Sequence, residues 1–259
     1  TMRYNLGRRS KALDQLKVAE DKVNRALAKE VELSRMKANF VTLASHEFRT
    51  PLTTILSSSF LIENYVAGPE RARVVKHLAK IKTSVNNLTS ILDEFLSVNR
   101  IEEGKIRTVT EWFNVKEHVE NFCHDLQSMA KAGQRILYIH EGAEEAKTDP
   151  VMLGHMVKNL LTNSIKYSSE HSNIEVNVSI GDTIQLRVKD QGIGIPAEDQ
   201  PHLFERFFRA SNASAVQGTG LGLHIVKCYV DMLKGTIEVK SVLGAGTEVK
   251  VVLPNEDKR

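Results

Sequence analysis

The sequence predicts an α + α/β protein, in which a helical hairpin precedes a domain that mixes helices and strands. Two observations support this fold class. Between about residues 8 and 102, glycine and proline occur only at Pro51 and in VAGPE at 66–70. After this stretch, glycines recur and apolar residues begin to alternate with polar ones, as they do in half-buried strands. We place the boundary in a linker at 103–112.

Composition limits the classes of function. Of the 259 residues, 41% are apolar and 26% are charged, which is typical of a globular protein. The 35 basic and 32 acidic residues nearly balance, with no basic stripe interleaved with aromatics, so we expect no nucleic-acid partner. Cys123 and Cys228 are too few and too far apart for a disulfide framework or a zinc site. No apolar run approaches the roughly 18 residues that span a bilayer.

Residues 1–34 form the first expected segment, a signalling helix or coiled-coil linker. Leu6, Leu13 and Leu27 share one heptad position, and Leu16 and Val23 share another. The chain begins abruptly in this helical pattern, so we expect a fragment whose upstream sensor domain is absent. The basic residues near the start would suit the cytoplasmic side of a membrane helix, although short basic runs are usually solvated surface. We therefore expect a cytoplasmic chain, with a membrane only through a missing N-terminal region of the parent protein.

Two long helices fill residues 35–102. Apolar residues fall at alternating steps of four and three in both, which makes one seam per helix. In the second helix the seam is Val74, Leu78, Ile81, Val85, Leu88, Leu92, Phe95 and Asn99. A lone two-helix hairpin buries too little surface, so we expect a homodimer in which two copies form a four-helix bundle.

His46 stands out in the first helix, within FVTLASHEFRTPLTTIL. It follows a seam residue and lies at the seam's edge, with Glu47 beside it and Thr50 one turn beyond. Pro51 cannot donate a backbone hydrogen bond, so the helix should bend there. An isolated helical histidine is usually an ordinary polar surface residue. An imidazole beside a carboxylate can also lose its Nδ1 proton to that base while Nε2 attacks an electrophile.

The second part contains a helix that begins in TDPVMLGHMVKNLLTNSIKYSS. Asp149 is a plausible N-cap, and Pro150 suits the first helical position. Asn159 and Asn163 lie one turn apart and present two amides on one side, which suits Mg²⁺ or phosphate oxygens. Lys166 would neutralise phosphate, and Tyr167 follows it. The alternative is a plain polar helix face.

Two alternating runs, residues 174–180 and 184–188, form a predicted hairpin. It leads into DQGIGIP, where a carboxylate at the end of a strand can accept a hydrogen bond from a flat ligand, although an ordinary strand-to-loop turn would look similar. Further on, GTGLG at 218–222 precedes an apolar helix and lacks the P-loop and dinucleotide signatures. Backbone amides at such a helix start suit phosphate.

These motifs together resemble those of two-component sensor histidine kinases. SHEFRTPL is similar to the H-box of that family, with Phe48 where leucine is more frequent, and the later segments resemble its N, G1, F and G2 boxes. The resemblance covers residues 35–254, and it implies a two-layer α/β sandwich ATP-binding domain at 113–259, after a dimerisation and phosphotransfer domain at 35–102. Phe208 stands where tyrosine is common, and Ser164 where alanine is common.

The resemblance also implies an activity and a set of site residues. His46 would accept the γ-phosphoryl group of ATP with Glu47 as general base, and would pass it to an aspartate of a response regulator receiver domain. Thr50 completes an H-E-x-x-T pattern that implies phosphatase activity toward that regulator. Asn159 is the implied Mg²⁺ ligand. The implied nucleotide-binding residues are Asn159, Asn163, Lys166, Tyr167, Asp190, Gly192, Gly194, Arg209, Gly218, Thr219, Gly220, Leu221, Gly222 and Thr247.

Two rival functions share the same nucleotide fold. One is an ATP-driven conformational clamp of the gyrase and Hsp90 type, which has no need of a kinked helix around His46. The other is a non-catalytic sensor dimer that binds nucleotide as a structural ligand. The joint presence of His46, Glu47, Asn159 and Asp190 argues against it.

Overall fold

The computed structural model describes residues 17, 20, 23, 24, 48–62, 71–213, 216 and 218–255. Residues 48–62 are helical and continue through Pro51, while His46 and Glu47 lie outside the described residues. The predicted bend at Pro51 therefore stays a prediction. The second helix of the expected hairpin is α2 (Arg71–Glu102). Every helix among the described residues is too short or too polar to cross a lipid bilayer.

The predicted seam of α2 divides into two rows in the single chain. Val74, Ile81, Leu88 and Phe95 are half-buried. Leu78, Val85 and Leu92 are 52%, 46% and 48% exposed. The sequence spacing predicts one continuous apolar seam, whereas the structure covers only one of its two heptad rows.

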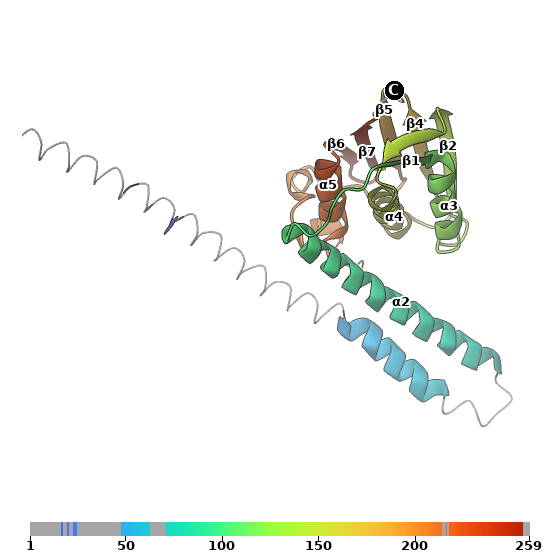
Figure 1. The fold of residues 1–259 in the computed structure, drawn as a ribbon. Helices are drawn as coiled ribbons and strands as arrows, with labels where there is room; N and C mark the ends of the chain where they lie inside the picture. The colour runs from blue at the N-terminus through green and yellow to red at the C-terminus, as the bar shows by residue number, and fades with distance from the viewer. Residues whose placement is uncertain are drawn as a thin grey trace, which may run out of the picture. The chain divides into compact units, whose positions relative to one another are not determined.

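The second part of the chain is a two-layer α/β sandwich (Figure 1). Its helices are α3 (Val115–Gln127), α4 (Pro150–Tyr167) and α5 (Gly222–Met232), with short 3₁₀ turns at Gln200–His202 and Ser211–Ala213. Its main strands are β2 (Arg135–Gly142), β4 (Asn173–Ile180), β5 (Thr183–Lys189), β6 (Thr236–Val242) and β7 (Gly246–Pro254). A small ribbon pairs β1 (Glu111–Asn114) with β3 (Glu145–Thr148). The predicted fold class of this domain is confirmed.

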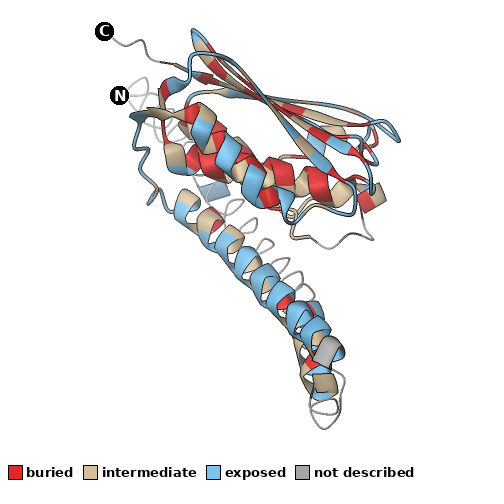
Figure 2. Ribbon diagram, turned by 90° about the vertical axis from the view of Figure 1, so that its right-hand side faces the viewer, coloured by how far each residue is buried: buried red, intermediate tan, exposed pale blue. Residues whose placement is uncertain are grey.

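The main sheet has the strand order β2-β4-β5-β7-β6. The predicted hairpin is the antiparallel pair β4 and β5, in which Ile180 pairs with Ile184. β2 is parallel to β4, and β7 lies between β5 and β6 in antiparallel register. Buried residues gather where the helices meet one face of this sheet (Figure 2). That arrangement follows from the strict alternation of buried and half-buried residues along β4.

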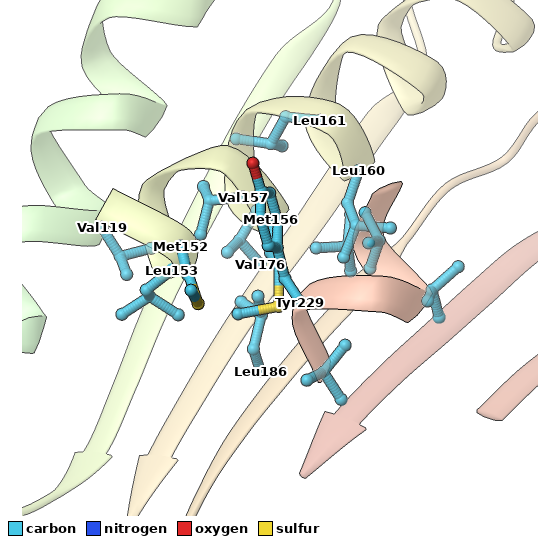
Figure 3. Packing of buried hydrophobic residues seen from close by; sticks show 14 of the residues in the cluster. Val119, Met152, Leu153, Met156, Val157, Leu160, Leu161, Val176, Leu186 and Tyr229 are labelled. Carbon is cyan, nitrogen blue, oxygen red and sulfur yellow. The ribbon is translucent and has the colours of Figure 1, made fainter. Parts of the chain in front are cut away.

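α4 lies over the middle of the sheet and forms the centre of the core. Its N-cap Asp149 accepts hydrogen bonds from the N–H groups of Val151 and Met152, each at 3.0 Å, and Pro150 occupies the first turn as predicted. Its apolar side packs against residues from α3, β4, β5 and α5 (Figure 3). The labelled residues there are Val119, Met152, Leu153, Met156, Val157, Leu160, Leu161, Val176, Leu186 and Tyr229. This packing leaves one polar edge of α4 outside the core.

Candidate nucleotide site

Asn159 and Asn163 occupy the polar edge of α4 and face the start of α5. The Asn159 Nδ2 donates to the carbonyl of His155 at 2.9 Å, which leaves its Oδ1 directed away from the helix. A Cβ built on Gly222 would lie 3.0 Å from the Asn159 Oδ1 and 3.7 Å from the Asn163 Nδ2. The two amides therefore meet the glycine-rich segment at 218–222, as the sequence predicts for a shared site.

Lys166 and Tyr167 lie at the other end of the same polar edge. A Cβ on Gly218 would lie 2.8 Å from the Lys166 Nζ and 3.9 Å from the Tyr167 hydroxyl. The Lys166 ammonium is 5.9 Å from the centroid of the Tyr167 ring. The glycine segment thus runs along the last two turns of α4, with an ammonium and two amides beside its backbone.

The conformation of the 218–222 segment requires glycine. Gly220 has a φ of +72°, and a Cβ there would lie 2.6 Å from the carbonyl oxygen of Phe208. Leu221 is only 2% exposed, so its side chain belongs to the core and only its backbone is available to a ligand. Its N–H donates to the Thr219 Oγ1 at 3.2 Å. The segment therefore delivers backbone groups, rather than side chains, to the first turn of α5.

Asp190 lies at the end of β5 and is only 9% exposed. Its Oδ1 accepts from the N–H groups of Gly192 at 2.9 Å and Thr247 at 3.2 Å, and its Oδ2 accepts from the Ser164 hydroxyl at 3.2 Å. Burial raises the pKa of the Asp190 carboxyl, and these three hydrogen bonds oppose the rise. Oδ1 accepts two hydrogen bonds and Oδ2 accepts one, so the carboxylate keeps one lone-pair direction, at Oδ2, for a further donor.

Close backbone packing holds the loop around Asp190 in place. A Cβ on Gly192 would lie 2.7 Å from the carbonyl oxygen of Tyr167, so this glycine lets the loop approach the end of α4. Gly246 has a φ of +110°, and a Cβ there would lie 2.1 Å from the carbonyl oxygen of Asp190. Gly194 has a φ of +63°, and its carbonyl accepts from the Asn212 side chain at 2.9 Å.

Thr247 also belongs to this cluster. Its carbonyl accepts from the Asp190 N–H at 2.8 Å, and its hydroxyl is 2.8 Å from the Ser241 Oγ. Thr247 is among the nucleotide-binding residues predicted from the sequence. Three other residues of this cluster, Ser164, Ser241 and Gly246, are not. Gly246 directly precedes Thr247 in the sequence, and Ser164 directly follows Asn163 on α4, so both had a local signal. Ser241 carries no local signal, because strand pairing alone brings it here.

Arg209 lies in the segment that connects the phenylalanines at 204–208 to α5. Its guanidinium donates to the carbonyl of Ala213 at 2.8 Å and to the carbonyl of Val216. The side chain therefore holds the base of the loop in this structure. Its implied contact with phosphate stays a prediction.

Two contacts connect this region to α2. The Thr219 hydroxyl donates to the Glu94 carboxylate, and Arg206 forms an ion pair with Glu102. Arg206 Nε also donates to the His224 Nε2 at 3.1 Å. His46, the expected phosphoacceptor, and Glu47, the expected general base, lie outside the described residues. Thr50 is described as an exposed helical residue whose carbonyl accepts from the Thr54 hydroxyl at 3.0 Å.

The donor set suits a nucleotide with Mg²⁺. Mg²⁺ prefers oxygen ligands and retains several waters beside substrate phosphates. Asn159 would supply one such oxygen, because its amide nitrogen is already used within the helix. Asn163 and Lys166 would supply donors for phosphate oxygens.

Comparison with known proteins identifies two families. Residues 148–257 match the family described as "Histidine kinase-, DNA gyrase B-, and HSP90-like ATPase", and residues 36–104 match the "His Kinase A (phospho-acceptor) domain". The first of these families binds ATP. Together the two matched segments cover most of the chain.

Sensor kinases are among the similar proteins. The chain is 32% identical over 246 residues to the autoinducer 2 sensor kinase/phosphatase LuxQ of Vibrio cholerae. This alignment covers 91% of this chain and 28% of LuxQ. It is 29% identical over 238 residues to the circadian input-output histidine kinase CikA of Synechococcus elongatus, covering 89% of this chain and 32% of CikA. The chain thus spans about a third or less of the length of these curated relatives.

Solved structures show the same fold. Full-length ShkA in complex with AMPPNP superposes with a TM-score of 0.60 at 23% identity, over 83% of this chain and 45% of ShkA. Because an H-box segment, the Asn159 edge, the 218–222 segment and the Asp190 cluster occur together with both family matches, the chain belongs to the two-component sensor histidine kinases.

Proposed function

We propose that this chain is the kinase core of its parent protein, which phosphorylates His46 with ATP and then passes the phosphoryl group to an aspartate of a response regulator. The observation that carries the proposal is the Asp190 cluster. Its buried carboxylate accepts a hydrogen bond from Ser164 of α4, the helix that also carries Asn159, within a fold shared with kinases. A carboxylate that keeps one accepting direction at the end of a strand suits an adenine amino group.

The two halves of the nucleotide have separate partners in this proposal. Asp190 reads the adenine amino group and Tyr167 covers the ring, while Gly192 and Gly194 let the backbone approach the base. Asn163, Lys166 and Arg209 contact phosphates, together with the backbone amides of residues 218–222 at the start of α5. Asn159 would ligate Mg²⁺ through its Oδ1. Bound ATP·Mg²⁺ supplies the transferable phosphoryl group and offsets its charge.

Residues of this chain move the proton and accept the phosphoryl group. The His46 Nδ1 proton moves to the Glu47 carboxylate while Nε2 attacks the γ-phosphorus in line with the bond to the leaving ADP oxygen. A P–N bond forms as that P–O bond breaks. In the second reaction the phosphoryl group leaves the His46 nitrogen for a carboxylate oxygen of the regulator's aspartate.

Dimerisation is part of the same proposal. Leu78, Val85 and Leu92 form one heptad row of α2 that is about half exposed in the single chain. A second copy would cover this row as a four-helix bundle, because a/d rows of this kind pack against facing helices. We further propose that the parent protein carries a sensor upstream of residue 1 and that this core works on the cytoplasmic side.

One incubation separates this function from its rivals. With γ-labelled ATP and Mg²⁺, the kinase should acquire label that is stable to alkali and lost in acid, and His46→Ala should remove it while nucleotide affinity is retained. An ATP-driven clamp would release labelled phosphate and keep no label on the protein. A non-catalytic nucleotide-binding dimer would do neither. Label that persists in His46→Ala at another histidine would disprove the acceptor assignment.

Thr50 provides a test of the proposed phosphatase activity. A hydroxyl one turn beyond His46 suits the orientation of a water for attack on a docked phosphoaspartate. Thr50→Ala should spare autophosphorylation and strongly slow dephosphorylation of the regulator, measured with a purified phosphorylated receiver domain. Pro51→Ala should shift the balance between the two activities. Loss of kinase activity as severe as in His46→Ala would show that Thr50 serves the kinase step or the fold.

A further inference from the structure

The last three carbonyl groups of α4 are closed by groups from outside its own helical ladder. The last turn of any α-helix leaves its final carbonyl groups without helical partners. In α4 these belong to residues 164–167, the same turn that presents Lys166 and Tyr167 to the nucleotide site. Each of the four carbonyl oxygens accepts a hydrogen bond, and the donors show what holds this turn.

Lys131, in the loop between α3 and β2, caps the turn with its ammonium group. The Lys131 Nζ donates to the carbonyl of Lys166 at 2.8 Å and to the carbonyl of Ser168 at 2.6 Å. A cation at a helix C-terminus also interacts favourably with the helix dipole. Lys131 is separated from these acceptors by 35 and 37 residues, so this cap depends on tertiary structure.

Gln134 caps the same turn from the buried side. It is 3% exposed, and its Nε2 lies 3.3 Å from the carbonyl of Ile165 and 2.9 Å from that of Ser169. Its Oε1 accepts from the Lys131 N–H at 2.8 Å, so the two capping residues fix each other. A buried amide with both ends engaged is costly to replace, because its partners would be left unsatisfied.

The remaining carbonyls connect the cap to the Asp190 loop. The Ser168 N–H donates to the carbonyl of Ser164 at 3.1 Å, and the Ile193 N–H donates to the carbonyl of Tyr167 at 3.2 Å. Ser168 and Gly192 form an isolated β-bridge. The end of α4 is therefore held between the Lys131–Gln134 loop on one side and the loop that orients Asp190 on the other.

The Lys131–Gln134 loop itself has little room to move. Gly133 has a φ of +69°, and a Cβ there would lie 2.0 Å from the His171 Nδ1. The His171 N–H donates to the carbonyl of Ala132 at 3.0 Å. The loop is thus fitted against the segment that follows α4, which makes it a rigid support for that helix end.

We propose that Lys131 and Gln134 are positioning residues for the nucleotide, which set the place of Tyr167, Lys166 and the Gly192 loop without contacting the ligand. This inference rests on the proposed nucleotide site. Loss of the Lys131 cap frees the carbonyl of Lys166 in the last turn and removes one donor from that of Ser168. The turn then frays, and the adenine and phosphate contacts lose their positions. Groups that support a ligand-binding shell act in this way in many sites.

The test measures Mg²⁺·AMPPNP affinity by calorimetry on the whole chain, at a temperature where each variant is folded. Lys131→Met keeps the aliphatic stem and removes the donors, and we expect it to weaken affinity about tenfold, as losses of supporting groups typically do. Lys131→Arg keeps a cation with several donors and should restore most of that affinity. Gln134→Glu, which replaces the buried donor with an oxygen, should weaken binding at least as much as Lys131→Met.

Two controls make the outcome decisive. Lys116→Met removes another exposed lysine and its ion pair with Glu144, far from the end of α4, and should leave affinity unchanged. Asp190→Asn tests the site itself, so unchanged affinity in that variant would overturn the proposed function. If Asp190→Asn weakens binding while Lys131→Met lowers only the melting temperature, the two residues have a purely structural role and the inference is wrong. Failure of Lys131→Arg to restore affinity would also overturn it.

Discussion

At the scale of single residues, the hydrogen bonds of Asp190 set the selectivity expected of the site. The Oδ1 is committed to two backbone N–H groups, from Gly192 and Thr247, which fixes the orientation of the carboxylate. The Oδ2 then faces Ser164 and the remaining space. This geometry explains why the side chain must present an acceptor. Replacing one carboxylate oxygen by a donor should therefore lower nucleotide affinity.

The first prediction replaces that acceptor by a donor. In Asp190→Asn the amide oxygen keeps the two backbone N–H groups, so the new NH₂ group would face the adenine amino group. We expect ATP affinity to fall by about 10-fold to 100-fold, and the preference for ATP over GTP to narrow. Calorimetry with both nucleotides measures the effect. Ser164→Ala, which removes only an orienting hydroxyl, should cost a few-fold at most, and a larger loss there would contradict this account.

The second prediction concerns His224, whose ring is used at both nitrogens in its neutral form. Nδ1 donates to the carbonyl of Phe204 at 2.8 Å, so Nε2 accepts from Arg206. Burial lowers the pKa of His224; the nearby charge of Arg206 also lowers it, while the Phe204 hydrogen bond and the Glu102 charge raise it. The unfolded chain therefore binds this proton more readily than the folded chain just below the ordinary pKa of 6.5. Stability should fall as pH drops through that window.

His224→Gln should flatten this pH dependence, by up to about 1.4 kcal/mol per pH unit for one proton. The measurement is the free energy of unfolding in denaturant at several pH values below 7, followed by the fluorescence of Trp112, the only tryptophan. The pKa of His155 is also lowered by burial, so some slope should remain and should fall again in the double variant with His155→Gln. An unchanged slope in both variants would rule out this assignment.

At the scale of single elements, α4 connects the core to the site, and its two ends are held differently. Its N-terminus is held by Asp149, which is 4% exposed and accepts from three N–H groups. Two of these belong to the first turn of the helix. The third is the N–H of Val109, at 2.8 Å from the Asp149 Oδ2, so the same side chain attaches the linker that follows α2. Its C-terminus depends on Lys131 and Gln134.

The third prediction tests the N-terminal end. Asp149→Ala removes a helix cap and leaves three N–H groups, one of them buried, without their acceptor, which should cost about 2 kcal/mol of stability. Asp149→Asn keeps an amide oxygen for the first turn and should lose less than half of that. Unfolding monitored at Trp112 gives both values. Equal losses in the two variants would show that the charge, rather than the cap, is what matters.

At the scale of the whole molecule, the exposed row of α2 predicts a second copy of the chain. Leu78, Val85 and Leu92 repeat every seven residues and remain about half exposed. Aligned apolar rows of this length are rarely left in water by a chain that otherwise buries its core well.

The fourth prediction places a charge in that row. Val85→Lys would bury two unpaired ammonium groups in a dimer, one from each copy. It should weaken dimerisation by about 100-fold or more. Sedimentation velocity over a range of concentrations measures the change. Asn86→Lys, the adjacent exposed position off the row, is the matched control and should remain dimeric. Nucleotide affinity should be unchanged in both variants, and a Val85→Lys chain that still forms dimers would exclude this row as the interface.

The sequence alone determined those parts of the molecule whose signals are local. The start of α4 follows from Asp149 and Pro150, and the β4–β5 hairpin follows from strict alternation about a glycine turn. The glycine-rich segment at 218–222 and the carboxylate at 190 were recognisable because each carries its chemistry within a few residues. These features depend on caps, periodicity and turn residues, which neighbouring residues specify.

The tertiary structure decided whatever depends on distant partners. The apolar pattern of β2 is misleading, because Leu137 and Ile139 are 40% and 50% exposed while the residues that alternate with them face the helices. Only its parallel pairing with β4 makes β2 a strand of the main sheet. Spacing likewise cannot tell which half of the α2 seam stays exposed. The hydrogen bonds from Lys131 and Gln134 to the end of α4 cross 35 and 31 residues. Such contacts form only when separate elements pack together, so no local pattern in the sequence encodes them.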